Sequence, residues 1–150
     1  MSVRRPTRLP GFTYVGRFSY SLRFATFQRR SHFTDPALIR SALLQIQRTG
    51  SEEQFALIAY CFMPDHVHLA IRGLDKESNL RRFVKITKQR VAYLARRQFA
   101  IPALWQGGYY ERVVRSHGME NLVRYILNNP MRAGLVKDGE QYPFSGSFCD

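Results

Sequence analysis

Two histidines, His66 and His68, are separated by a single residue in a segment that is otherwise apolar. Side chains at positions i and i+2 of a β-strand point to the same face, so a strand here would bring both imidazoles together. Val67, Leu69 and Ile71 would then lie on the opposite face. Two imidazole nitrogens a short distance apart form half of a metal site. A His-x-His pair is more often two polar strand positions without a metal, and the spacing leaves both interpretations open.

A tyrosine and an asparagine, Tyr125 and Asn129, are four residues apart, which places them one turn from each other on the same face of a helix. A phenol with an ordinary pKa near 10 is a poor nucleophile unless a base or a metal activates it. A divalent ion held by the histidine pair would polarise a phosphodiester beside the phenol, and the Asn129 amide oxygen would complete its ligands. The structural alternative makes Tyr125 a core aromatic and Asn129 a helix cap before Pro130.

The composition indicates a nucleic-acid partner. The chain has 150 residues, enough for one domain over 1–150, and its 23 Lys and Arg against 11 Asp and Glu give a formal net charge of +12. The longest apolar run, Phe55 to Met63, is too short to span a bilayer, and no signal peptide is evident, so we expect no membrane and an intracellular location. Cys61 and Cys149 offer no disulfide framework and are expected to be free thiols.

The elements that must position these residues follow from periodicity. Alternation of apolar and polar side chains over 17–27 predicts a half-buried strand, and Asp35-Pro36 predicts the start of a helix that Gly50 closes. Further strands are predicted over 55–63, 66–72 and 109–115, and helices over 78–97 and 119–129, the last one stopped by Pro130. The order β-α-β-β-α-β plus a further helix predicts an α+β split β-α-β sandwich, with an antiparallel sheet and helices on one face.

Basic and aromatic residues are the candidates for contacting DNA. Arg81, Lys85, Lys88 and Arg96 recur at helical spacings and are predicted to form one basic stripe, although each has the alternative of a solvated charge. Residues 1–11 are predicted to form a flexible basic arm with Arg4 and Arg5, and residues 138–150 a C-terminal tail. Arg132 is a further candidate for binding phosphate. Tyr109 and Tyr110 could stack on unpaired bases, whereas Trp105 is predicted to belong to the core.

Several segments resemble one known family. Residues 60–69, Tyr-Cys-Phe-Met-Pro-Asp-His-Val-His-Leu, resemble the strand of the HUH single-strand nucleases, in which a hydrophobic residue separates two histidines. Residues 104–106, 108–110, 124–136 and 142–147 are similar to the REP-associated tyrosine transposases, relatives of the IS200/IS605 transposases. The resemblance extends over residues 14–148, and its specificity comes from the occurrence of all these motifs in one order.

The resemblance implies a ferredoxin-like fold, a catalytic tyrosine at Tyr125 and metal-binding histidines at His66 and His68. Relatives of the insertion-sequence type supply the third ligand as glutamine, where this chain has Asn129. The implied cofactor is Mg²⁺ or Mn²⁺. The implied partner is single-stranded DNA folded as a REP- or BIME-like hairpin, and a monomer is expected rather than the swapped dimer of the insertion-sequence type. The expected location is the bacterial cytoplasm, in association with the nucleoid.

The expected reaction is a transesterification, in which Tyr125 attacks the scissile phosphate to give a 5′-phosphotyrosine and a free 3′-hydroxyl. Attack by a second 3′-hydroxyl would reverse the step without ATP, and the sequence contains no G-x-x-x-x-G-K-[ST] loop. The alternative from another class is a non-catalytic module that binds structured single-stranded DNA or RNA, since the split β-α-β sandwich also serves RNA-binding domains. The chain lacks the aromatic-rich pattern typical of those domains.

Overall fold

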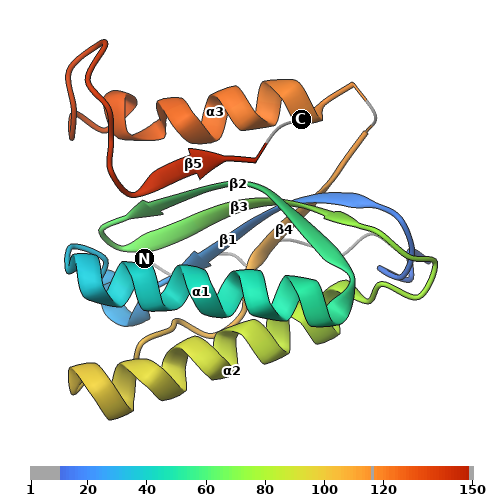
Figure 1. Ribbon diagram of the computed structural model, residues 1–150, viewed down its shortest axis with the longest axis horizontal. Helices are drawn as coiled ribbons and strands as arrows, with labels where there is room; N and C mark the ends of the chain where they lie inside the picture. Colours follow the sequence, from blue (N-terminus) through green and yellow to red (C-terminus); the bar gives the residue numbers. More distant parts are fainter. Residues whose placement is uncertain (1–10, 116, 149–150) are drawn as a thin grey trace.

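Strands and helices alternate along the chain as the sequence predicts (Figure 1). The structure is a computed structural model that describes residues 11–115 and 117–148. The predicted arm with Arg4 and Arg5, and Cys149, lie outside the described residues. The elements are β1 (Ser19–Ala25), η1 (Phe27–Arg29), α1 (Pro36–Glu53), β2 (Phe55–Met63), β3 (His66–Gly73), α2 (Leu80–Phe99), β4 (Tyr110–Val114), α3 (Met119–Arg132) and β5 (Ser145–Ser147).

The strands form one antiparallel sheet in the order β4-β1-β3-β2-β5. The first four strands have the order expected from a β-α-β-β-α-β chain, which confirms the predicted α+β ferredoxin-like fold. β5 was not predicted, because a Ser-Gly-Ser segment carries neither length nor alternation. It pairs with the outer side of β2, and the Tyr142 hydroxyl beside it donates a 2.7 Å hydrogen bond to the Phe62 carbonyl.

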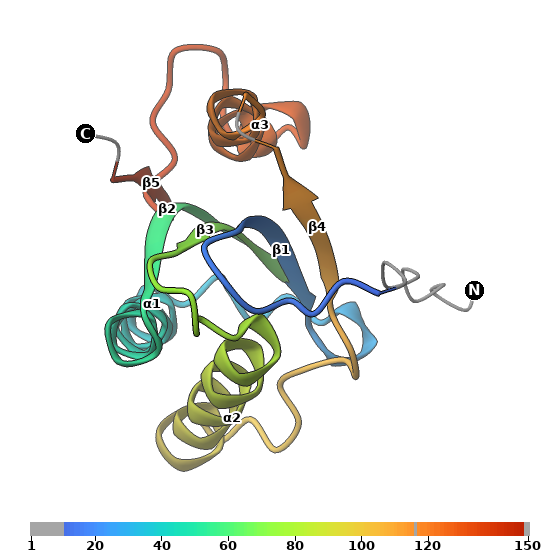
Figure 2. The same ribbon diagram turned by 90° about the vertical axis from the view of Figure 1, so that its right-hand side faces the viewer.

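The two faces of the sheet carry different helices (Figure 2). α1 and α2 cover one face and enclose the larger core, to which β3 contributes Val67, Leu69 and Ile71. α3 covers the other face, where a smaller core is formed by Ala59, Cys61, Met63, Ala70, Val114, Leu122, Val123 and Ile126. Within the described residues, no helix combines the length and apolar character needed to cross a membrane.

The sheet face that carries His68 is covered by α3 and is not open to solvent. α3 has an apolar stripe at Leu122, Val123 and Ile126, and such a stripe is stable in water only when it is buried against another element. α3 packs on the sheet face that α1 and α2 leave uncovered. As a result His68 is buried beneath α3, where its ring contacts that of Tyr125.

α1 begins as predicted, with the Asp35 carboxylate accepting a hydrogen bond from the Ala37 N–H. It does not end at Gly50 but continues to Glu53, and Gln54 takes the left-handed conformation that ends it. Gly50 is required for close packing, since a Cβ at this position would lie 2.7 Å from the Phe55 carbonyl oxygen. The missing side chain therefore serves the contact between the helix and the start of β2.

α3 also continues beyond its predicted end. Pro130 lies inside the helix and is buried, and the helix extends to Arg132. Proline removes one N–H from the helical ladder, but the following turn has its own bonds. The Ala133 N–H donates to the Asn129 carbonyl, and the Leu135 N–H to the Pro130 carbonyl. This extra turn brings Arg132 back over the face of α3 that carries Tyr125.

Candidate active site

His68 lies in the middle of the sheet, on the face that α3 covers, and is only 7% exposed. Its Nε2 is 2.8 Å from the Ser21 hydroxyl on β1. Burial, together with the nearby positive charge of Arg23, lowers the pKa of His68 to about 4. The imidazole is therefore neutral at pH 7 and keeps a nitrogen lone pair that can bind a metal.

His66 is oriented by the residue that precedes it. Its Nδ1 lies 2.9 Å from an Asp65 carboxylate oxygen, and the second oxygen of that carboxylate accepts a 3.0 Å hydrogen bond from Arg29 Nε. Burial lowers the pKa of His66, and the Asp65 carboxylate only partly offsets this effect. Burial alone would raise the pKa of Asp65, but the His66 hydrogen bond and the Arg29 charge lower it. An ionised Asp65 that accepts from Nδ1–H leaves His66 Nε2 as the free acceptor.

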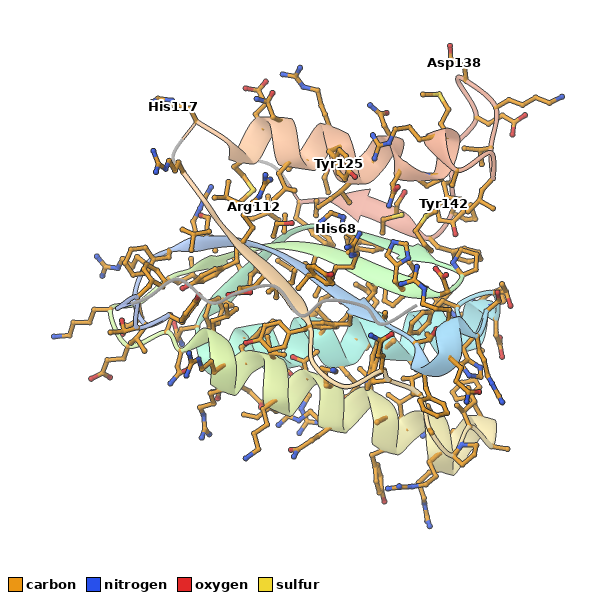
Figure 3. All side chains as sticks on the ribbon, turned by 180° about the vertical axis from the view of Figure 1, so that it is seen from behind. His68, Arg112, His117, Tyr125, Asp138 and Tyr142 are labelled. Atoms are coloured by element: carbon orange, nitrogen blue, oxygen red, sulfur yellow. The ribbon has the colours of Figure 1, made fainter. Side chains whose placement is uncertain are left out.

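Tyr125 extends from α3 toward the same part of the sheet. Its side chain is 52% exposed, so the structural alternative of a core aromatic does not apply. The ring meets the His68 imidazole edge to face, with the centroids 5.9 Å apart and the planes at 75°. Figure 3 shows the Tyr125 and His68 side chains facing each other between α3 and the sheet. The structure thus brings the predicted tyrosine and one predicted histidine together from positions 57 residues apart in sequence.

Asn129 lies one turn further along α3 and is partly buried. The helix ends at Arg132, with Ala133 as its cap, so Asn129 is not the capping residue that the alternative required. Its amide oxygen lies 3.4 Å from Arg132 Nη2. The same nitrogen donates to the Tyr125 carbonyl at 2.9 Å, and the guanidinium carbon lies 3.9 Å from the centre of the Tyr125 ring.

A groove of about 610 Å³ opens beside Tyr125, between α3 and the strands β1 and β4. Its walls include Arg23, His68, Tyr110, Arg112, Asn121 and Tyr125. The Arg23 guanidinium lies over the Tyr110 ring at 4.8 Å from its centroid, which presents a flat, positively charged surface. The groove therefore places Tyr125 and His68 next to arginines that can bind a phosphate and a tyrosine on which an unpaired base can stack.

The candidate metal ligands are His66, His68 and Asn129. Within residues 11–115 and 117–148, no three His, Cys, Asp or Glu side chains gather as a metal-binding group, but the third predicted ligand is an amide. Both imidazoles are neutral, and His66 has the outer carboxylate that metal-binding histidines commonly have. α3 runs antiparallel to β3 (Figure 1). Asn129 follows Tyr125 along α3, whereas His66 precedes His68 along β3. Asn129 is therefore displaced from Tyr125 in the same direction as His66 is from His68. These nitrogen and oxygen donors fit a divalent ion.

The basic residues predicted to form a stripe on α2 line two separate grooves. Arg81, Lys85 and Lys88 line one shallow groove together with Tyr109. Arg96 lines a different groove, between α1 and α2. Arg96 lies eight residues beyond Lys88, about 12 Å along the helix axis, toward the far end of α2. Lys88 itself donates to the Gln106 and Gly108 carbonyls at 3.2 and 2.7 Å and so holds the loop before β4.

The three aromatic candidates have different environments. Trp105 belongs to the core as predicted, since its indole N–H donates to the Lys88 carbonyl at 3.1 Å and its ring packs on Phe33. Tyr109 packs edge to face on Phe24 and is partly buried. Tyr110 lines the groove beside Tyr125. Of the predicted stacking residues, Tyr110 is the one at the candidate site.

Sequence reasoning missed several residues at the site, among them Arg112 and Asn121 in the groove wall and Ser21, Arg23 and Asp65 around the histidines. Ser21 and Arg23 lie on the polar side of the alternating strand β1, and the antiparallel register puts Arg23 directly opposite His68. Asp65, in the turn before β3, contacts His66. The alternation of β1 and the position of Asp65 beside His66 were the available signals, but only the strand register joins Ser21 and Arg23 to the histidine.

Comparison with known sequences places these features in one family. The profile of a family described as "Transposase IS200 like" matches residues 14–129. A REP-associated tyrosine transposase of Escherichia coli K12 is 24% identical over 148 residues, covering 97% of this chain and 82% of that protein. A protein of Haemophilus influenzae provisionally named a REP-associated tyrosine transposase is 24% identical over 157 residues, covering 93% and 84%.

Two solved structures share the fold. A REP-associated tyrosine transposase bound to a REP hairpin superposes with a TM-score of 0.73 at 20% identity, covering 97% of this chain and 82% of that chain. A bacterial tRNA(His) guanylyltransferase-like protein in complex with GTP gives a TM-score of 0.56 at 11% identity, covering 86% and 70%. Because proteins of such different activity share this fold, the fold alone does not determine function.

Proposed function

Because the chain belongs to the family of IS200-like transposases, we propose that it is a metal-dependent enzyme that cleaves and rejoins single-stranded DNA. The observation that carries this proposal is the position of Tyr125, a half-exposed phenol that meets the ring of His68 at the end of a basic groove. A tyrosine nucleophile can be activated by a metal ion, and a buried, neutral His68 beside Tyr125 is suited to hold that ion.

In the proposed reaction the Tyr125 oxygen attacks the scissile phosphorus in line with the departing 3′-oxygen. A bond forms between the phenol oxygen and phosphorus, and the bond between phosphorus and the 3′-oxygen breaks. The phenol loses its proton to solvent, and the 3′-oxygen gains one. The products are a 5′-phosphotyrosine and a 3′-hydroxyl end. Attack by another 3′-hydroxyl on the phosphotyrosine reverses these bonds and joins two strands.

His66, His68 and Asn129 are the proposed ligands of Mg²⁺ or Mn²⁺. A divalent ion bound there would polarise the phosphodiester and stabilise negative charge on the departing oxygen. Asp65 keeps the His66 ring in one orientation through its Nδ1, and Ser21 does the same for His68 through Nε2. Burial keeps both rings neutral, so they can act as ligands at physiological pH.

The proposed substrate is a REP- or BIME-like hairpin with a single-stranded extension. The relative of known structure is bound to a REP hairpin, and the family of this chain and its excess of basic residues support the same partner. We propose that the extension lies in the groove beside Tyr125, on the stacked Arg23 and Tyr110 side chains, with Arg112 near a phosphate. The residues proposed to contact other phosphates are Arg4, Arg5, Arg81, Lys85, Lys88, Arg96 and Arg132, with Tyr109 as a further stacking residue.

The enzyme is proposed to act as a monomer in the bacterial cytoplasm, at the nucleoid. Tyr125 already lies beside His68 of its own chain, with the centroids 5.9 Å apart. No exchange of α3 between two copies is needed to bring the tyrosine to the histidine. This arrangement supports a monomer over a swapped dimer.

The test is to incubate the protein with a REP-type hairpin bearing a single-stranded extension, with Mn²⁺, and to run a denaturing gel. A covalent protein–DNA band that disappears with chelator, in His66→Ala and in His68→Ala supports the proposal. Salt-sensitive binding to several hairpins and metals without any covalent band would contradict it. That outcome would favour the non-catalytic binding module instead.

A further inference from the structure

Arg132 contacts the candidate nucleophile through both its ring and its backbone. The guanidinium carbon lies 3.9 Å from the centre of the Tyr125 ring, which is a close stacking contact. Nη2 of the same side chain donates to the Tyr125 carbonyl at 2.9 Å and lies 3.4 Å from the Asn129 amide oxygen. A flat guanidinium with several donors can make these contacts together, whereas an ammonium cannot stack in this way.

The contacts confine the Tyr125 ring from two directions. The His68 imidazole meets it edge to face, and the Arg132 guanidinium covers one of its faces. An exposed tyrosine without such neighbours would exchange freely between rotamers. The carbonyl bond in turn anchors Arg132 to the helix that carries the tyrosine. The phenol is therefore held in one orientation at the mouth of the groove before DNA binds.

The charge of Arg132 is also suitably placed. Attack on phosphorus requires the phenol oxygen to become negatively charged as its proton leaves. A guanidinium held against the ring stabilises that charge. The continuation of α3 past Pro130 is what carries Arg132 to this position.

A neighbouring arginine shows that this contact is particular to Arg132. Arg124 is also on α3, directly before Tyr125 in sequence, and is also exposed. Its Nη2 donates to Glu120 at 3.0 Å, in an exposed pair one turn along the helix. Arg124 thus has the same charge and lies on the same helix as Arg132, but it pairs with an acidic residue. Arg124→Ala is therefore a matched control for the loss of an arginine from α3.

We propose that Arg132 is a positioning residue for the nucleophile, which orients the Tyr125 ring and stabilises its developing charge, and that general phosphate binding is secondary to this role. The inference rests on the proposed function, because it requires that Tyr125 attacks DNA. It predicts that loss of Arg132 slows the chemical step at saturating DNA and leaves DNA affinity close to that of Arg124→Ala.

The test compares the unmodified protein with Arg132→Ala, Arg132→Lys and Arg124→Ala. DNA affinity is measured by fluorescence anisotropy in chelator, and the rate constant of covalent complex formation in single turnover with saturating DNA and Mn²⁺. Both Arg132 variants should slow the reaction by about 10- to 100-fold, since a small misplacement of a reacting group has effects of that size. Arg124→Ala should react at the unmodified rate. Added ethylguanidinium should partly restore Arg132→Ala and leave Arg124→Ala unchanged.

Two results would overturn the assignment. If the Arg132 variants react at the unmodified rate once DNA is saturating and only bind DNA more weakly, Arg132 is a phosphate contact. If the unmodified protein forms no covalent complex, the proposed function fails and the role of Arg132 fails with it. Arg132→Lys keeps the charge and the long side chain, so it provides the test even if Arg132→Ala does not fold.

Discussion

The His68 imidazole and the Tyr125 ring meet edge to face, with centroids 5.9 Å apart, and this distance is set by how closely α3 approaches the sheet. Three of the sheet residues beneath α3 are small: Ala59, Cys61 and Ala70 are fully buried there. Small side chains let a helix lie close to a sheet. The packing of the smaller core therefore determines whether nucleophile and histidine meet.

Enlarging one of these small residues should separate the pair. Ala70→Leu should destabilise the protein by about 1–3 kcal/mol, as overpacking of a core does, and should also slow covalent complex formation by the protein that remains folded. Ala42→Leu is the matched control, because Ala42 is fully buried against the opposite face of the sheet. Urea unfolding and single-turnover adduct formation measure the two effects. Equal adduct rates in the two variants would show that α3 packing does not control the site.

Asp65 should support metal binding although it is not itself a proposed ligand. Asp65→Asn removes the charge that fixes the His66 ring, and loss of such an outer carboxylate typically lowers metal affinity by about 10- to 100-fold. Isothermal titration with Mn²⁺ measures the affinity without DNA. Asp35→Asn makes the same charge change at a helix cap, where asparagine is equally suitable, and should leave the affinity unchanged. An unchanged affinity in Asp65→Asn would exclude this role.

The groove on α2 should contribute to DNA affinity through charge alone. Changing Arg81 and Lys85 together to glutamine should weaken binding and make the plot of log affinity against log salt less steep by about 1.5, if both contact phosphate. Arg97→Gln removes a charge about 18 Å further along the same helix and serves as the control. If the slopes of the double variant and the unmodified protein coincide, this groove does not lie on the DNA path.

Tyr142 should make stability depend on alkaline pH. Burial, followed by the nearby Cys61, raises the pKa of Tyr142 to about 12, above the value near 10 expected in the unfolded chain. Its contribution to stability is therefore fully present below pH 10 and is lost as pH rises toward 12. Tyr142→Phe should be less stable at pH 7 by about 1 kcal/mol, because the bond to the Phe62 carbonyl is lost. Urea unfolding should show that difference shrinking between pH 9 and 11, and a constant difference would refute the assignment.

The sequence carried much of the fold because its signals are local. Alternation in β1, the apolar run of β2 and the Asp35 cap each depend on neighbouring residues, and together they specified the order of the elements. The predicted ends of α1 and α3 were wrong. They were placed at Gly50 and before Pro130 because glycine and proline usually end helices. Both residues stay inside their helices, where Gly50 allows a close approach to Phe55 and the turn after Pro130 has its own hydrogen bonds.

The candidate site was predictable only in part. The shared face of His66 and His68 follows from strand geometry, and the turn between Tyr125 and Asn129 follows from helix geometry. The bond from Ser21 to His68 depends on which strand neighbours β3, and the stack of Arg132 on Tyr125 depends on α3 passing through Pro130. Such contacts between distant segments require the tertiary structure.

The most direct test of the account is to identify the residue that becomes attached to DNA. The covalent complex formed with a REP-type hairpin and Mn²⁺ is digested with trypsin and nuclease, and the modified peptide is sequenced by mass spectrometry. Cleavage after Arg124 and Arg132 releases a peptide over residues 125–132 whose only tyrosine is Tyr125. A nucleotide on this tyrosine, and no adduct in Tyr125→Phe, is the predicted result. A nucleotide on any other residue, or an adduct that persists in Tyr125→Phe, would contradict the assignment of Tyr125 as the nucleophile.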